Sequence, residues 1–289
     1  MSESIGDAVR AGYGAAARQG LGSHQEGVRK IAQAFGYSED DLGSIPDEAN
    51  MGLSCGNPVA LASLREGETV VDLGAGGGLD VFLAAREVGP TGLAVGIDMT
   101  ADMVTLARAN AARGGYENVR FYLAEIETMP IPSASVDCVI SNCVLNLCED
   151  KDAALAEVFR ILRPGGRLAV SDLVLKQPLP DEIVEQVAAW IGCIGGAISM
   201  ASYREKLLAA GFSAIEIQDT GADLYAYKEA GSNAGGETAE PVSAPGCCES
   251  VAPDAASDPA FHDRMSALLQ SVDANEYAAS ARIFALKPE

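Results

Sequence analysis

The chain of 289 residues is long enough for one large α/β domain with an appendage or for two small domains, and its 48% hydrophobic residues can fill a core. Its 41 acidic residues against 20 Lys and Arg give a formal net charge of -21, which argues against a nucleic-acid partner because a phosphate backbone needs a basic face. No apolar run of about 18 residues and no signal-peptide pattern occur, so we expect a cytoplasmic protein without a membrane partner.

Residues 1–50 contain two or three short helical patterns, which we interpret as a lid that precedes the sheet. One pattern ends at Gly36 and places four apolar side chains on one face, namely Val28, Ile31, Ala32 and Phe35. The segment 37–42 then predicts a capped turn that opens another helix.

The segment 50–58 is a glycine-rich loop that carries Cys55 just before the first predicted strand. A loop in this position can fold over the carboxyl edge of a sheet. The chain has seven cysteines, an odd number, and without an export signal we interpret them as thiols rather than as a disulfide framework. Taken alone, Cys55 is interpreted as a structural thiol.

The segment 69–80 is a short β-branched run, an acidic residue and a set of glycines, followed by a helical pattern. Glycines in such a turn let backbone N–H groups approach a ligand at the positive end of a helix, so the loop predicts a cofactor cradle. The dinucleotide fingerprint fails because its third glycine would fall at Leu79. The D-x-G-x-G-x-G pattern that starts at Asp72 resembles instead the loop of class I methyltransferases, which bind S-adenosylmethionine. The resemblance implies that Gly74 and Gly76 pack on the methionine part and that Asp72 holds its amino group.

The next predicted strand ends at Asp98, 20 residues beyond Gly78. A carboxylate at this position can accept both ribose hydroxyls of an adenosine, although a nicotinamide enzyme would place an acid there too. Met99, directly after it, is included among the expected cofactor contacts through the same resemblance.

Strands and helices alternate from residue 69 to 175, as a doubly wound parallel sheet requires. We expect strands at 69–73, 93–98, 118–123, 136–141 and 166–172. We expect helices at 79–88, 101–113 and 152–162. The predicted fold class is therefore α/β, a Rossmann-like class I methyltransferase sheet in which residues 51–175 form the cofactor domain.

Two further loops at the same edge of the sheet carry candidate residues. In the methyltransferase family an apolar and an acidic residue after the third strand bracket the adenine, which implies this role for Ile126 and Glu127; a solvated acidic turn is the alternative. The fourth strand leads into Asn142 and Cys143, which we expect beside the reactive methyl group. Cys138, within that strand, is interpreted as an inert core thiol.

Residues 176–289 are predicted to form a cap and then to return to the sheet. Two helices are expected over 178–210, with glycines that would let the backbone pack tightly around Cys193. The alternating runs 214–218 and 280–286 are expected to pair as antiparallel strands, as in class I methyltransferases.

The segment 229–260 between these strands is rich in Gly, Ala, Ser, Pro and Glu, and we expect it to be a mobile insertion. It contains the adjacent residues Cys247 and Cys248, which either chelate a soft ion, form a strained disulfide or are an incidental pair in a linker. The role of Cys148 stays undecided at this point.

Three thiols, Cys55, Cys143 and Cys193, are expected to meet above the cofactor, and three thiolates suit a soft, thiophilic acceptor. Together with the flanking segments G-L-S-C-G-N-P, S-N-C-V-L-N-L and G-C-I-G-G, this combination resembles the arsenite methyltransferases. The resemblance covers roughly residues 25–218 and the final strand. It implies that the three cysteines bind As(III), with Cys143 and Cys193 as the core pair, and that Cys247 and Cys248 are further candidate ligands.

The resemblance also implies a thiol reductant, glutathione or thioredoxin, as co-substrate, and we expect a monomer. One feature departs from the family, because Tyr13-Gly14 is present without the N-terminal cysteine that many members carry after it. The alternatives are a class I methyltransferase of a small organic acceptor and a thiol-rich arsenite-binding protein without catalysis. A nicotinamide oxidoreductase fits least, because of the glycine spacing.

Overall fold

A computed structural model describes residues 5–184, 193–226 and 273–289 of the chain. Its sheet has eight strands, seven of them in the order β3-β2-β1-β4-β5-β8-β7, with a short β6 beside β5. The strands are β1 (Thr69–Leu73), β2 (Leu93–Asp98), β3 (Val119–Leu123), β4 (Val136–Asn142), β5 (Leu162–Leu175), β6 (Ile198–Ser199), β7 (Ser213–Asp219) and β8 (Ala278–Leu286).

The helices of the described residues fall into an N-terminal group and a group that alternates with the strands. The first group is α1 (Ile5–Ala17), α2 (Glu26–Ala34), α3 (Glu39–Gly43), the 3-10 turn η1 (Asp47–Ala49) and α4 (Pro58–Ala62). The second is α5 (Leu79–Val88), α6 (Ala101–Gly114), η2 (Ile126–Thr128), η3 (Leu145–Leu147), α7 (Lys151–Ile161), α8 (Asp181–Val184), α10 (Met200–Ala209) and α13 (Ala274–Tyr277).

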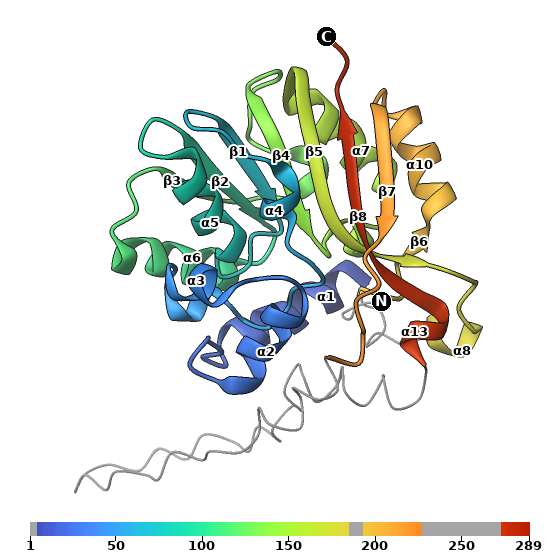
Figure 1. Cartoon of the computed structure of the whole chain (residues 1–289), viewed down its shortest axis with the longest axis horizontal. Coiled ribbons are helices and arrows are strands. Elements are labelled where there is room, and N and C mark those ends of the chain that lie inside the picture. The colour runs from blue at the N-terminus through green and yellow to red at the C-terminus, as the bar shows by residue number, and fades with distance from the viewer. Residues whose placement is uncertain (1–4, 185–192, 227–272) are drawn as a thin grey trace, which may run out of the picture.

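Strands β1 to β5 run parallel, whereas β8 is antiparallel to both of its neighbours β5 and β7. The predicted pairing of the last two strands is therefore confirmed, and so is the doubly wound sheet. The order reverses between β1 and β4, so their carboxyl ends open a crevice at the point where α/β sheets bind ligands. Helices α1 and α2 lie beneath these lower ends of the strands (Figure 1).

The helix boundaries follow from local sequence. Ser38 and Asp41 form a capping box at the start of α3, and Asn57 caps α4, which has Pro58 in its first turn. Helix α6 ends at Gly114, and the left-handed backbone of the following Gly115 closes the last turn. The apolar face of α2 that the sequence predicts is buried in the structure.

Three predictions of secondary structure need correction. Strand β5 begins at Leu162, where the sequence predicts a break over 163–166, because these residues bulge out between the pairings of Leu162 with Val136 and Arg167 with Cys138. Helix α4 was not predicted, since five residues show no helical period. Within 178–210 the described residues contain α8, β6 and α10 rather than two helices alone.

The predicted insertion 229–260, with Cys247 and Cys248, lies outside the described residues. In the described part of the chain, none of the helices combines the length and the apolar character that a membrane crossing requires.

Candidate active site

A cavity of about 480 Å³ lies at the carboxyl ends of β1 and β4. The eight residues that the sequence predicts as cofactor contacts all line it: Asp72, Gly74, Gly76, Asp98, Met99, Ile126, Glu127 and Asn142. Cys143 lines it as well, whereas Cys55 and Cys193 are not among the lining residues but belong to the same buried cluster as Cys143. The cavity thus collects residues from four different strand ends, as the parallel topology requires.

The glycine loop between β1 and α5 can have no side chains at its tightest points. Gly74 has a left-handed backbone with φ 66°, and a Cβ there would collide with Val144. A Cβ on Gly77 would lie 2.8 Å from the carbonyl oxygen of Glu48. The loop is closed by the Ala75 N–H, which donates to the Ile97 carbonyl at 2.9 Å. Its shape therefore depends on glycine and leaves backbone groups open to the cavity.

Three carboxyl groups line the cavity around this loop. Burial raises the pKa of Asp72 well above its usual range, and the neighbouring charges of Asp80 and Asp98 raise it further. Burial also raises the pKa of Asp80 to about 6, against the lowering effect of hydrogen bonds from Tyr37 and Asn142. Arg10 also lines the cavity, but its guanidinium pairs with Asp7 and Glu125. The cavity therefore suits a ligand that carries positive charge.

Asp98 is oriented by the backbone on both sides. The Gly76 N–H donates to its Oδ2 at 2.9 Å and the Thr100 N–H to its Oδ1 at 2.8 Å. Each carboxylate oxygen keeps a further lone pair, so the group can still accept the two hydroxyls of a ribose. An adenosine with a cationic methionine part, as in S-adenosylmethionine, fits this set of donors and acceptors.

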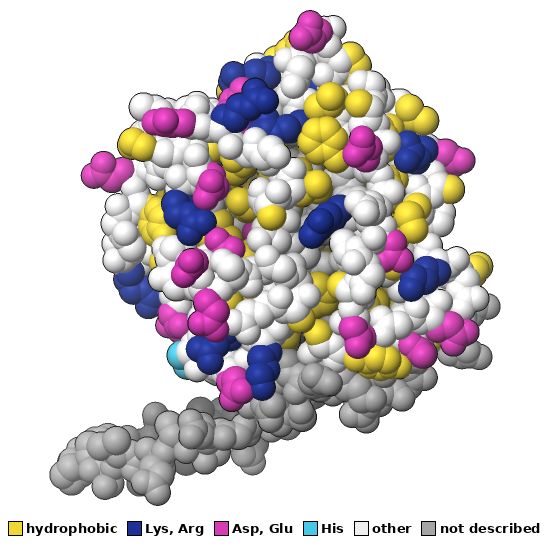
Figure 2. Space-filling view, in the orientation of Figure 1, with side chains coloured by type: hydrophobic (Ala, Val, Ile, Leu, Met, Phe, Trp, Pro, Cys, Tyr) yellow, Lys and Arg dark blue, Asp and Glu magenta, His cyan; other side chains and the backbone are white. Residues whose placement is uncertain are grey.

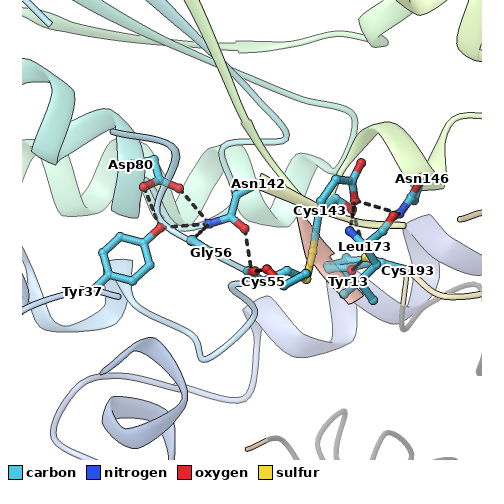
Figure 3. The surroundings of a disulfide bond; sticks show 12 residues. Tyr13, Tyr37, Cys55, Gly56, Asp80, Asn142, Cys143, Asn146, Leu173 and Cys193 are labelled. Atoms are coloured by element: carbon cyan, nitrogen blue, oxygen red, sulfur yellow. Dashed lines mark hydrogen bonds between the residues drawn. A yellow bond between two sulfur atoms is a disulfide. The ribbon is translucent and has the colours of Figure 1, made fainter. Parts of the chain in front are cut away.

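The three candidate cysteines belong to one buried cluster with Ile31, Phe35 and Leu173. Cys55 and Cys143, 88 residues apart in sequence, form a disulfide with a Cα–Cα distance of 5.9 Å (Figure 3). The Cys193 Sγ donates to the carbonyl oxygen of Cys143 at 2.9 Å. All three therefore lie together at the carboxyl end of β4.

This arrangement corrects one expectation and leaves another untested. The cysteines were expected to be thiols, yet Cys55 and Cys143 are joined, because folding brings their backbones within the range of a disulfide. The role of Cys143 and Cys193 as the core pair of arsenic ligands stays a prediction; in the structure Cys143 is joined to Cys55, and Cys193 is outside any disulfide. Burial raises the pKa of the Cys193 thiol to about 12, with a further contribution from Asp172.

Cys143 and Cys193 both have left-handed backbones, with φ 61° and φ 63°. A residue with a Cβ pays about 1–2 kcal/mol for this conformation, and such strain occurs preferentially at functional sites. The strained turns direct both residues toward the same cluster. No pattern in the sequence signals this geometry.

Two further cysteines are separate from the cluster. Cys138 is completely buried in β4, as predicted, and burial raises its pKa to about 12. Cys148 lines the cavity after η3, and burial together with the nearby Glu127 raises its pKa to about 12.

Sequence reasoning missed several residues of the site. Tyr37, in the lid, donates its hydroxyl to Asp80 at 2.7 Å, and Asn142 donates to Tyr37 at 2.8 Å. Helix α1 contributes Arg10 and Tyr13 to the cavity wall. The Tyr13 hydroxyl lies 3.8 Å from the Cys193 Sγ. Asp80 stands in the predicted loop segment, but only its position in space reveals its role.

A doubly wound sheet with an antiparallel final pair, and a glycine loop beside carboxylates at its switch point, defines a class I methyltransferase fold. The chain belongs to the methyltransferase domain family, whose model matches residues 64–231.

Individual relatives narrow the comparison. The chain is 47% identical over 186 residues to a protein named arsenite methyltransferase from Halobacterium salinarum. The aligned region is 64% of this chain and 48% of the relative. A protein of the same name from Aquipseudomonas alcaligenes is 36% identical over 158 residues, covering 52% of this chain and 46% of the relative. The chain thus spans less than half of the length of either curated relative.

Among the solved structures that resemble this chain, one is similar over most of its length. It is an arsenic(III) S-adenosylmethionine methyltransferase from Chlamydomonas reinhardtii, with a TM-score of 0.55 and 25% sequence identity. The similarity covers 91% of this chain and 73% of that one.

Proposed function

We propose that this protein transfers methyl groups from S-adenosylmethionine to trivalent arsenic held by the thiolates of Cys55, Cys143 and Cys193. The observation that carries the proposal is the position of Cys143, which lines the cofactor cavity and contacts both Cys55 and Cys193. The relatives named arsenite methyltransferase support the same acceptor.

The cofactor half of the proposal rests on charge and shape. Asp72 and Asp80 offer carboxylates to the cationic methionine part, Asp98 accepts the ribose hydroxyls, and Ile126 with Glu127 brackets the adenine. Bound in this way, the cofactor supplies an electrophilic methyl group on a sulfonium. The glycine loop fixes its orientation because no side chain intervenes.

The thiolate half requires a reduced protein. A reductant first opens the Cys55–Cys143 disulfide, supplying two electrons and two protons. Three thiols then bind arsenite with loss of water, and sulfur ligands leave the lone pair on arsenic free. When this pair attacks the methyl carbon, the As–C bond forms and the C–S bond breaks, with its electrons staying on sulfur. The nucleophile carries no proton, so the step needs no general base.

Arsenic is oxidised by two electrons in this step, and a further pair of electrons must return it to the trivalent state. We propose that a thiol reductant, glutathione or thioredoxin, supplies these electrons. The reaction would detoxify arsenic in the cytoplasm, and the enzyme would act as a monomer. Cys247 and Cys248 are proposed as additional arsenite ligands that deliver it to the site.

The test incubates purified protein with S-adenosylmethionine, arsenite and a thiol reductant and identifies the arsenic species formed. Cys143→Ser should lower the rate of methylation by on the order of 100-fold, because it removes the thiolate that positions arsenic against the methyl group. Cys138→Ala, inside β4 and five residues before Cys143, is the control for the loss of a nearby thiol and should keep most of the activity. Methylation by Cys143→Ser at the wild-type rate would contradict the proposal and favour an organic acceptor.

A further inference from the structure

A buried hydrogen-bond network connects the cofactor cavity to the loop that carries Cys55 (Figure 3). The Tyr37 hydroxyl donates to Asp80 Oδ1 at 2.7 Å. The Asn142 Nδ2 group donates to the Tyr37 oxygen at 2.8 Å and lies 3.2 Å from Asp80 Oδ2. Tyr37 is 2% and Asp80 5% exposed, so the bond between them is buried, whereas the bonds of Asn142 are partly buried beside the cavity.

The other end of the network holds the Cys55 loop by its backbone. Asn142 Oδ1 accepts the Cys55 N–H at 2.9 Å, and Asn142 Nδ2 donates to the Gly56 carbonyl at 2.8 Å. The Ser280 hydroxyl donates to the Cys55 carbonyl at 2.6 Å from the opposite side. A Cβ on Gly56 would lie 2.6 Å from the Ser171 side chain, so the loop has little room to shift.

The two ends of the network therefore belong to different ligands of the proposed reaction. Asp80 and Asn142 line the cofactor cavity, while the bonds of Asn142 to Cys55 and Gly56 set the position of the thiol. Both amide hydrogens of Asn142 already have acceptors, so we assign this cavity residue a positioning role toward the Cys55 loop.

We propose that Tyr37 and Asn142 couple the two sites, so that a cationic ligand in the cofactor cavity strengthens the binding of trivalent arsenic at Cys55. This inference rests on the proposed function. It adds an energetic link between cofactor and acceptor, carried by residues that touch neither reacting atom.

The physical basis is the charge of Asp80. An ionised Asp80 accepts charge-assisted bonds from the Tyr37 hydroxyl and the Asn142 amide, whereas a protonated Asp80 would bring a further hydrogen to a place already filled by donors. Its pKa of about 6, raised by burial, means that nearby charge can shift this balance. A cation in the cavity favours the ionised form and hence the network that fixes the Cys55 peptide.

Thermodynamic linkage makes the coupling reciprocal. If a cavity ligand raises the affinity for arsenite by some factor, arsenite must raise the affinity for that ligand by the same factor. The factor measured for arsenite with and without the cavity ligand must equal the factor measured for the cavity ligand with and without arsenite, which provides an internal check.

The experiment uses the full chain, reduced with a phosphine, and titrates arsenite by calorimetry with and without sinefungin. This cofactor analogue has an amine where the cofactor has its sulfonium and carries no transferable methyl group. In the wild type, sinefungin should tighten arsenite binding by about fivefold or more, the lower end of common coupling factors. In Tyr37→Phe, which keeps the ring but removes the hydroxyl, the factor should fall below about twofold.

Tyr116→Phe is the matched control, because it removes another tyrosine hydroxyl that bonds to the lid, at the Ser44 carbonyl, away from the cavity. It should keep the wild-type coupling. Asn142→Ala is a second variant, and it should lose the coupling as Tyr37→Phe does.

The outcomes separate this inference from the proposed function. A reduced wild type that binds no arsenite would overturn both. Arsenite and sinefungin that bind independently in the wild type, or coupling that persists in Tyr37→Phe and Asn142→Ala, would overturn the coupling and leave the proposed function standing. Equal loss in Tyr116→Phe would also overturn it, since the effect would then not depend on the network.

Discussion

The carboxyl groups around the glycine loop differ in what surrounds them. Asp72 has its pKa raised well above its usual range by burial and by two acidic neighbours, whereas burial raises the pKa of Asp98 against the lowering effect of hydrogen bonds from two backbone N–H groups. For Asp80, burial raises the pKa to about 6, and hydrogen bonds from Tyr37 and Asn142 limit the rise. Its charge therefore changes within the range of pH in which the fold can be studied.

This difference predicts how cofactor binding depends on pH. Because the pKa of Asp80 is raised to about 6, its negative charge is present at pH 8 and is lost as the pH falls through 6. The affinity for S-adenosylmethionine should drop by roughly tenfold between pH 8 and pH 5, equivalent to about 1.4 kcal/mol.

Equilibrium binding at several pH values checks this expectation. Asp80→Asn should bind more weakly at pH 8 and show a flatter profile, while Asp219→Asn, on the exposed edge strand β7, should behave as the wild type. A wild-type affinity that does not change with pH would show that Asp80 does not face the cation.

At the scale of elements, helix α1 closes one side of the cavity. Arg10 and Tyr13 lie on the cavity wall, and Val9 and Ala16 are completely buried in a cluster with Met51 and Met103. The ion pairs that α1 makes, such as Arg10 with Glu125, are partly exposed and contribute little on their own. The buried apolar face of α1, which includes Val9 and Ala16, therefore holds the helix in place.

A single charge on the buried face of α1 should detach this helix from the domain. Val9→Asp would bury a carboxylate without a partner, at a cost of several kcal/mol, and α1 should separate from the domain instead. Hydrogen exchange should become fast over α1 and stay slow in the sheet, and cofactor affinity should fall by about tenfold or more, as roughly 1.4 kcal/mol of contact is lost.

Ala11→Asp is the control, because it adds the same charge to the exposed face of the same helix. It should leave exchange and binding unchanged. Slow exchange over α1 in Val9→Asp would mean that the helix is held by other contacts.

The sequence predicts the elements better than their junctions. The bounds of β1, β2 and α5 match the predicted ranges, because each is an apolar run bounded by glycine or a charged residue. The start of β5 does not, since a bulge that keeps a strand continuous depends on its pairing with β4. Short elements such as α4 and β6 contain too few residues to show a period.

The site shows the same division. Residues with a motif around them, such as Asp72 and Asp98, could be predicted as cavity residues because the topology alone brings strand ends together. Tyr37 could not, since its partners Asp80 and Asn142 lie 43 and 105 residues away and nothing local marks the contact. The disulfide partner of Cys143 likewise depends on how a loop folds over the sheet.

The charge of the whole molecule is the feature that composition already reveals. The net charge is -21, and on the face shown in Figure 2 acidic side chains are spread among basic ones rather than gathered in one patch. Folding brings these like charges closer together, and the resulting repulsion destabilises the compact state.

Salt should therefore stabilise this protein. Raising KCl from 0.1 to 1 M shortens the screening length from about 10 Å to about 3 Å, and the melting temperature should rise by at least about 3 °C, which corresponds to roughly 1 kcal/mol for a chain of this size. Thermal unfolding followed by circular dichroism measures the shift. At pH 5, where fewer carboxylates are charged, the same step should give a smaller rise, and an equal rise at both values would point to a cause other than repulsion.

The bond between Ser280 and the Cys55 carbonyl spans 225 residues and comes from a strand inserted between β5 and β7. During synthesis on the ribosome, the segment around Cys55 emerges early. The hydrogen bond from Ser280 can form only after β8 has been synthesised. Until then a thiol-bearing loop stays open to oxidants and to stray metals in the surrounding fluid. The time between the appearance of the first cysteine and that of the last strand is thus a period of chemical exposure for each new molecule.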